Sequence, residues 1–356
     1  MVERLDLRRH EDNSEGDRKV VNVEYHDDLK EVQSDAALAR LLSPEMQSAP
    51  FDRLEWWRLL DEHCGLSPRL AVARNGVGSA VLPLTGTGPH LTQLSNWYTF
   101  RFRPVVSPGA EALLADLARD LSSRARRLTL TGLPEEDADQ LETAFRAAGW
   151  LAWREQSDVN HVLEVAGRDY AAFLAGRPGK LRTTLKRKSG KVVTQVLTRF
   201  DADVWAAYEE IYAESWKPEE GSPAFLRAFA QAEGEAGRLR LAVAHAADDS
   251  SGPALAAQMW TVEGGTAFIH KLAHRESAKP LSPGSVLSAA LFRHVIDVDT
   301  VTLVDFGTGD DPYKRDWMEQ VRPRYRLDLV RPQAPANWPV IARRMVRSLA
   351  ATAKRG

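Results

Sequence analysis

Apolar residues recur every three or four positions in two parts of the chain, which predicts helices with one buried face. The first group is Leu54, Trp57 and Leu60, and the second is Trp205, Tyr208, Ile211, Tyr212 and Trp216. Runs rich in β-branched and aromatic residues, at Leu239–Ala244 and Thr266–Leu272, predict buried strands. The chain therefore mixes helices with strands in both of its halves.

The order of the expected elements occurs twice. Ala71–Arg74 and Ala242–His245 each open a pair of strands, and Ser107-Pro108-Gly109 and Ser282-Pro283-Gly284 each precede a helical pattern. The other matching segments are Ser79–Leu84 and Ala254–Val262 for the second strand, Ala110–Leu121 and Ser285–Val298 for the helix, and Leu128–Leu133 and Val301–Phe306 for the last strand. Their shared order and nearly constant spacing favour an internal duplication.

We expect an α/β fold in which mixed sheets flanked by helices are built twice. The chain of 356 residues exceeds one comfortable core. We divide it into a charged, disordered arm at residues 1–20, an N-terminal half at 21–160 and a C-terminal half at 161–331. Residues 332–356 should form a proline-containing linker and a basic amphipathic helix.

The composition excludes several classes of protein. The formal net charge of −2 gives no overall attraction to nucleic acid or membrane. The single cysteine, Cys64, excludes an internal disulfide, and the histidines lack the spacing of metal ligands. No apolar run reaches the roughly 20 residues that span a bilayer. We expect a cytoplasmic protein without a metal, with at most a peripheral membrane contact through its C-terminal helix.

Six motifs in the C-terminal half occur in a fixed order. They are Lys180–Val192 (KLRTTLKRKSGKV), Ala213–Trp216 (AESW), Leu255–Trp260 (LAAQMW), Ile269–Glu276 (IHKLAHRE), Leu281–Leu287 (LSPGSVL) and Val304–Trp317 (VDFGTGDDPYKRDW). Together they resemble the branch of GNAT acetyltransferases related to the cellulose-biosynthesis protein CelD and to the FemAB peptidoglycan transferases. The resemblance implies a tandem GNAT fold and transfer of an acyl or aminoacyl group to an amine. The first half resembles the family only in its layout.

The Ser-Pro-Gly motif of the second half is the candidate donor site. Ser282 suits an N-cap and Pro283 the first helical position, so the helix start would aim amide N–H groups at an anion. By resemblance, Pro283, Gly284 and Ser285 would receive the pyrophosphate of an acyl-CoA. The structural alternative is a well-capped surface helix. In the N-terminal copy, Glu111 and Asp116 would repel a pyrophosphate.

The resemblance also implies that the strand at Thr266–Leu272 diverges from its neighbour. Its unpaired amides, up to Leu272, would then bind the pantetheine arm of the donor. Lys271 would contact an anionic part of the donor or acceptor. The alternative for Lys271 is an ordinary lysine at a sheet edge, with its ammonium group in water.

The segment after Val304 is the candidate catalytic region. Asp305 or Asp310 would serve as the base that takes a proton from the amine. By resemblance, Tyr313 would protonate the departing thiolate, and Lys314 would bind a carboxylate or phosphate. In the structural alternative the aspartates cap a helix, Tyr313 packs and Lys314 pairs with an acid.

The basic stretch from Arg168 to Lys191 is the candidate acceptor site. Lys180, Arg187 and Lys188 could gather along one helix edge and bind a phosphorylated or nucleotide-linked acceptor. Trp216 and Trp317, within the motifs of the resemblance, are expected to line the same site. A tRNA acceptor stem fits less well, because no interleaved aromatics accompany the basic residues. A solvated helix face is the alternative.

These observations predict an N-acyltransferase that uses acetyl-CoA or another acyl-CoA. Its acceptor would be the primary amine of an amino sugar or of a precursor of the cell envelope or a polysaccharide. One alternative is a FemAB-type transferase that depends on aminoacyl-tRNA. The other is a non-catalytic accessory protein of polysaccharide biosynthesis, in which the duplicated scaffold has lost its chemistry.

Overall fold

The computed structural model describes residues 21–215 and 220–353. The expected arm at 1–20 and Trp216 lie outside the described residues. The elements of the first half are β1 (Asn22–His26), α1 (Leu29–Ser34), α2 (Ala36–Leu41), α3 (Leu54–Cys64), β2 (Pro68–Arg74), β3 (Ser79–Thr85), β4 (His90–Gln93), β5 (Val105–Val106), α4 (Leu113–Arg124), β6 (Arg127–Leu133), α5 (Glu135–Ala147) and β7 (Leu151–Glu164). The predicted early helix lies within α3.

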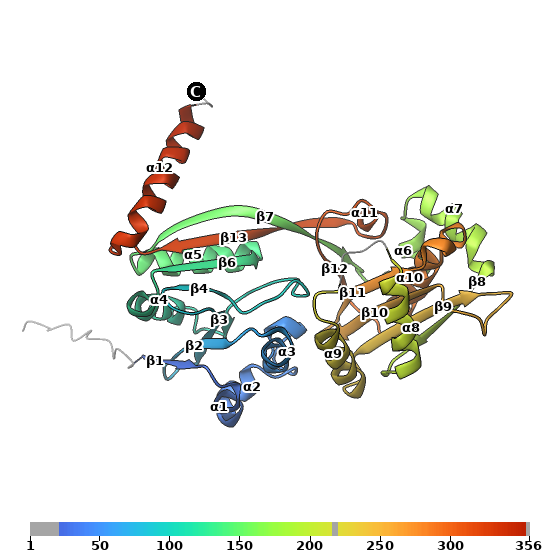
Figure 1. The fold of residues 1–356 in the computed structure, drawn as a ribbon, viewed down its shortest axis with the longest axis horizontal. Helices are drawn as coiled ribbons and strands as arrows, with labels where there is room; N and C mark the ends of the chain where they lie inside the picture. Colours follow the sequence, from blue (N-terminus) through green and yellow to red (C-terminus); the bar gives the residue numbers. More distant parts are fainter. Residues whose placement is uncertain (1–20, 216–219, 354–356) are drawn as a thin grey trace, which may run out of the picture.

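The second half repeats this order. Its elements are α6 (Tyr170–Ala175), α7 (Gly179–Lys188), β8 (Val192–Leu197), α8 (Ala202–Ala213), α9 (Pro223–Glu235), β9 (Leu239–Ala246), β10 (Ala256–Glu263), β11 (Thr266–His274), α10 (Pro283–Arg293), β12 (Leu303–Thr308), α11 (Lys314–Trp317) and β13 (Gln320–Val330). A terminal helix, α12 (Trp338–Ala353), projects from the first half (Figure 1).

The strands of both halves form one mixed sheet of 13 strands among the described residues. Its order is β1-β2-β3-β4-β6-β13-β7-β12-β11-β10-β9-β8, with β5 paired to β3. In each half one pair of strands is parallel and joined across a helix: β4 with β6 across α4, and β11 with β12 across α10. The expected α/β fold with a repeated layout is confirmed.

The two long strands β7 and β13 join the halves (Figure 1). β13, the last strand in sequence, pairs with β6 of the first half and with β7. Its Leu327 and Leu329 are fully buried in the core of the first half. β7 pairs in turn with β12 of the second half. The division at residue 160 therefore falls inside a strand that serves both halves.

Helices cover both faces of the C-terminal part of the sheet. Because side chains alternate along a strand, β9 sends Leu241 and Val243 to one core and Ala242 and Ala244 to another. α8 and α9 cover the first face, together with Trp56 and Trp57 of α3 from the other half. α6, α7 and α10 cover the second face. The halves thus share one apolar core across the first face.

The helix after the first Ser-Pro-Gly begins later than the sequence predicts. The expectation was a helix from Ala110, whereas α4 begins at Leu113. The Ser107 hydroxyl accepts a hydrogen bond from the Ser79 amide at 3.1 Å, and Ser107 N–H donates to the Ser79 carbonyl at 2.8 Å. The motif is tied to the edge of β3 and forms a turn instead of a helix start.

Candidate active site

A pocket of about 350 Å³ opens beside the start of α10. We call it the α10 pocket. Its walls come from α7, β10, β11, α10, β12 and α11, and thus from the second half alone. The lining residues are Leu181, Gln258, Leu272, Ala273, His274, Lys279, Ser282, Pro283, Gly284, Ser285, Ser288, Phe306, Tyr313, Asp316 and Trp317. The predicted donor residues Leu272, Pro283, Gly284 and Ser285 are brought together here, with Tyr313 and Trp317.

The start of α10 differs in detail from the expected cap. Ser282 occupies the N-cap position, but in a left-handed conformation with φ of 54°, and its side chain makes no capping hydrogen bond. The Ser282 carbonyl accepts from the Val286 amide at 3.2 Å. The amides of Gly284 and Ser285 therefore precede the hydrogen-bond ladder of the helix, and the helix start carries the positive end of the dipole.

A buried glutamine, Gln258, holds the start of α10 in place through hydrogen bonds. Gln258 of β10 donates to the Gly284 carbonyl at 3.0 Å and to the Ser288 hydroxyl at 2.9 Å. The indole of Trp260 donates to the Gln258 side-chain oxygen at 3.0 Å. Gln258 was not among the predicted site residues, although a glutamine inside the apolar run LAAQMW was the signal that could have found it.

The strands β11 and β12 diverge at the pocket. They are paired only from Thr266 with Leu303 to Phe268 with Asp305, although β11 continues to His274 and β12 to Thr308. Beyond the last pair, Leu272 and Phe306 line the pocket. Among the described residues, no further β11–β12 pairing follows Phe268 with Asp305. The divergence implied by the family resemblance is present.

Tyr313 stands at the mouth of the pocket. Its side chain is 38% exposed and its ring contacts that of Phe306 edge to face, at a centroid distance of 5.7 Å. Partial burial, with the nearby Asp311 carboxylate, raises the pKa of Tyr313 to about 12. The phenol therefore keeps its proton well into the alkaline range. Trp317 stacks on Phe292 at 4.8 Å and closes the inner wall.

The two carboxylates that were predicted to serve as the catalytic base lie outside the α10 pocket. Asp305 is buried and accepts from Asn160 at 2.7 Å and from the Gly307 amide at 2.8 Å. Asp310 is exposed and accepts from Arg315 at 2.7 Å and pairs with His161 at 3.1 Å. The hydrogen bond from Arg315 lowers the pKa of Asp310, which makes it a weaker base.

Two of the predicted site lysines, Lys271 and Lys314, also lie outside the pocket. Leu272 lines the pocket, so its neighbour Lys271 faces the opposite side of the sheet. There Lys271 donates to Glu220 at 2.6 Å and lies 4.2 Å from the centre of the Trp97 ring. Burial lowers the pKa of Lys271. Lys314 is buried and donates to the Thr308 carbonyl; burial lowers its pKa too.

The basic residues of α7 lie around the pocket but not in it. Leu181 of this helix lines the pocket, whereas Lys180 and Arg187 are exposed and Lys188 is half-buried. Among the described residues, no group of three His, Cys, Asp or Glu side chains is placed to hold a metal ion. In the same part of the chain, the search for a helix long and apolar enough to cross a membrane finds no candidate.

The comparisons with known proteins agree with this geometry. Residues 179–315, which include most of the pocket, match the family described as an acetyltransferase (GNAT) domain. This match makes the chain an acyltransferase. No curated protein matches the sequence significantly.

Three solved structures share the fold of the chain. A FemX crystal structure is 11% identical with a TM-score of 0.58, and the match covers 85% of this chain and 96% of that one. The C-terminal domain of a putative lysylphosphatidylglycerol synthetase from Agrobacterium fabrum is 14% identical with a TM-score of 0.55, covering 88% and 96%. A conserved protein of unknown function from Bacteroides thetaiotaomicron is 12% identical, with a TM-score of 0.55 and coverages of 87% and 100%.

Proposed function

We propose that this acyltransferase moves an acyl group from an acyl-CoA thioester to the primary amine of a polar acceptor. One observation carries the proposal: the α10 pocket combines a helix start with amides ahead of the ladder and a gap between two diverging strands. A helix start can bind a pyrophosphate, and the part of β12 beyond its pairing with β11 can hydrogen-bond the amides of an extended pantetheine arm. In this proposal the α10 pocket would hold both the pyrophosphate and the pantetheine arm of the donor.

In this proposal Tyr313 is the general acid. The acceptor nitrogen attacks the thioester carbonyl, the carbon–sulfur bond breaks, and the Tyr313 hydroxyl donates its proton to the leaving sulfur. The proton released by the nitrogen restores the phenol by way of solvent. The high pKa of Tyr313 supports this role, because the group is protonated at every pH at which the amine is reactive.

The acceptor is proposed from the surroundings of the pocket. Lys180, Arg187 and Lys188 belong to α7, the helix whose Leu181 lines the pocket, and their charges suit a phosphorylated or otherwise anionic acceptor. An amino sugar or a precursor of the cell envelope or a polysaccharide has this chemistry. The resemblance to the CelD branch, a cytoplasmic location and a peripheral membrane contact through α12 belong to the same proposal. In α12 Trp338 and Met345 are exposed.

An aminoacyl-tRNA donor is the second candidate. Its support is the shared fold with FemX and with the lysylphosphatidylglycerol synthetase domain, together with the basic α7. Calorimetric titration of the unchanged protein with acetyl-CoA, longer acyl-CoAs and charged tRNA separates the two. We expect saturable binding of acyl-CoA. Tight binding of charged tRNA without any effect of CoA would reverse the assignment.

Tyr313→Phe tests the chemical role. We expect kcat to fall about 100-fold, within the range for loss of a general acid, while the Kd for acyl-CoA stays unchanged. The control is Tyr325→Phe, which removes an exposed hydroxyl that donates to Glu135 in the first half. Turnover by Tyr313→Phe equal to that of Tyr325→Phe would exclude the phenol as the acid.

A further inference from the structure

A buried polar chain crosses three neighbouring strands next to the α10 pocket. Arg324 of β13 donates to the Asn160 side-chain oxygen at 2.6 Å, and Asn160 of β7 donates to Asp305 of β12 at 2.7 Å. All three side chains are buried. Arg324 makes its other hydrogen bonds to the Phe100 and Pro323 carbonyls. The side-chain amide of Asn160 therefore lies between the guanidinium of Arg324 and the carboxylate of Asp305.

Asn160 and Asp305 together hold both peptide groups of Gly307. The Gly307 amide donates to Asp305 at 2.8 Å, and the Gly307 carbonyl accepts from Asn160 at 3.1 Å. Gly307 has a φ of 68°, and a Cβ atom there would lie 3.0 Å from the Phe100 ring. Only glycine fits this conformation and this contact without strain.

Gly307 lies in a β-bulge at the point where β11 and β12 separate. Pairing of β12 with β7 shifts between Asp305 and Thr308, so one extra residue is inserted on β12. Pairing of β12 with β11 ends at Asp305 as well. The residue next to the bulge, Phe306, points into the α10 pocket and contacts Tyr313. The bulge therefore decides where the gap opens and where Phe306 stands.

We propose that Asn160 and Asp305 are positioning residues for the donor thioester. They fix the Gly307 bulge, and through it the free edge of β12 and the Phe306–Tyr313 contact, while α10 binds the distal part of the donor on its own. This inference rests on the proposed function and gives Asp305 a role different from that of a base. It also gives the first half a role, because the Phe100 ring packs against Gly307 and the Phe100 carbonyl accepts from Arg324.

Asn160→Asp is the sharpest test, since it keeps the shape and replaces both donated hydrogen bonds by repulsion between oxygens. We expect kcat to fall about 100-fold, the effect of displacing reacting groups by about 1 Å, while the Kd for CoA stays within twofold.

Asp305→Asn distinguishes a positioning role of Asp305 from a role as catalytic base. It also replaces Asn160→Asp as the test if that variant does not fold. An amide at this place still accepts from Gly307 and from Asn160, so we expect kcat to fall less than about 10-fold. Loss of a general base would cost about 100-fold or more. The matched control is Asn337→Asp, because Asn337 is also buried and donates to two carbonyls, of Arg126 and Arg331, at 2.9 Å.

Asn337→Asp should lower the unfolding temperature and leave kcat and Kd unchanged. Hydrogen exchange gives a readout that needs no donor: in Asn160→Asp, the amides of Phe306 and Gly307 should exchange faster and those of α10 should not. Equal kcat in Asn160→Asp and the unchanged protein, or a parallel change in kcat and Kd, would overturn the inference. Failure of the unchanged protein to bind CoA would instead count against the proposed donor.

Discussion

The two Ser-Pro-Gly segments have the same sequence and different structures. At Pro283 the motif starts α10, and Gly284 and Ser285 line the pocket. At Pro108 the motif forms a turn after β5, and the Gly109 amide donates to the Glu111 carboxylate at 3.2 Å. A protein carboxylate thus takes the amide that an anionic donor would need. The comparison teaches that a duplicated motif keeps its binding role only where the helix begins at it.

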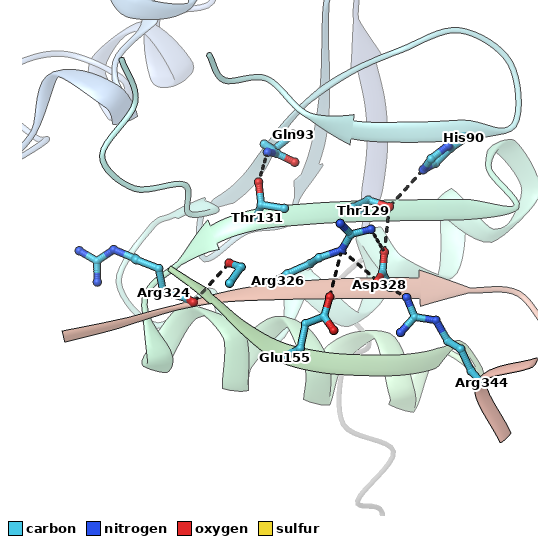
Figure 2. A network of polar contacts seen from close by, with 10 residues as sticks. His90, Gln93, Thr129, Thr131, Glu155, Arg324, Arg326, Asp328 and Arg344 are labelled. Atoms are coloured by element: carbon cyan, nitrogen blue, oxygen red, sulfur yellow. Dashed lines mark hydrogen bonds and ion pairs between the residues drawn. The ribbon is translucent and has the colours of Figure 1, made fainter. Parts of the chain in front are cut away.

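The halves also differ in what fills their polar positions. Beside the first half, side chains of β4, β6, β7, β13 and α12 form hydrogen bonds and ion pairs with one another (Figure 2). At the centre of this network Asp328 is buried and accepts from Thr129 and Arg326 at 3.0 Å and from Arg344 of α12. The polar groups of the first half support its fold, whereas those around α10 leave a cavity open.

Placing a negative charge at the start of α10 should have the largest effect on donor binding. Ser285→Glu places a carboxylate where the dipole favours an anion, so we expect the Kd for acyl-CoA to rise at least about 100-fold. Glu111→Gln is the matched change in the first half and should leave the Kd unchanged. Calorimetry checks both. Donor binding altered by Glu111→Gln would mean that the halves are less different than the structure indicates.

Breaking the Asp328 network should affect stability alone. Asp328→Ala removes the acceptor shared by Arg326, Arg344 and Thr129, and we expect a loss of about 2 kcal/mol in the free energy of unfolding. Burial alone would raise the pKa of Asp328. The two arginine partners lower it by more, so the net pKa lies below that of an ordinary aspartate. Its contribution is therefore present above the ordinary pKa and disappears as the pH falls through the lowered one.

Urea unfolding measures this loss, and the activity assay supplies the contrast. Acyl-CoA binding and kcat of Asp328→Ala should match those of the unchanged protein wherever both are folded. A change in kcat at full folding would connect the network in Figure 2 to the chemistry, and the separation of the two halves would then be wrong.

The sequence predicted most of the elements and the start of α10, because both depend on local patterns. Spacing of apolar residues located α3 and α8, and the Ser-Pro-Gly motif located the start of α10. Sheet register is different, since it depends on pairing between distant strands. No local pattern shows that β13 passes between β6 and β7, and so the long junction of the halves could not be predicted.

The same limit explains the misplaced site residues. Neighbours on a strand face opposite sides, so Lys271 could not share the pocket with Leu272, nor Asp305 with Phe306. Which member of each pair faces the pocket depends on the helix that covers the face, and the bulge at Gly307 depends on Asn160, far away in sequence. Alternation alone would have warned that only one of each pair belongs to the site.

The smallest expected effect concerns the seam between the halves. Arg53, next to α3 in the first half, pairs with Glu233 of α9 at 2.9 Å and with Glu263 of β10 at 3.3 Å. Glu263 is buried, and neither of its side-chain oxygens has a hydrogen-bond partner. Burial raises the pKa of Glu263 to about 7. The folded protein therefore binds a proton that the unfolded chain would release at a lower pH.

The contribution of Glu263 to the free energy of unfolding is fully present below the ordinary pKa of a glutamate. It is lost as the pH rises through about 7. Glu263→Gln removes the titration and should stabilise the protein at pH 8 by on the order of 1 kcal/mol, with little difference at pH 5. Thermal unfolding across this range, with the exposed Glu235→Gln on α9 as control, measures the difference. A constant difference at all pH values would place the titrating group elsewhere, because only a group ionising at the seam makes the gain from Glu263→Gln grow with pH.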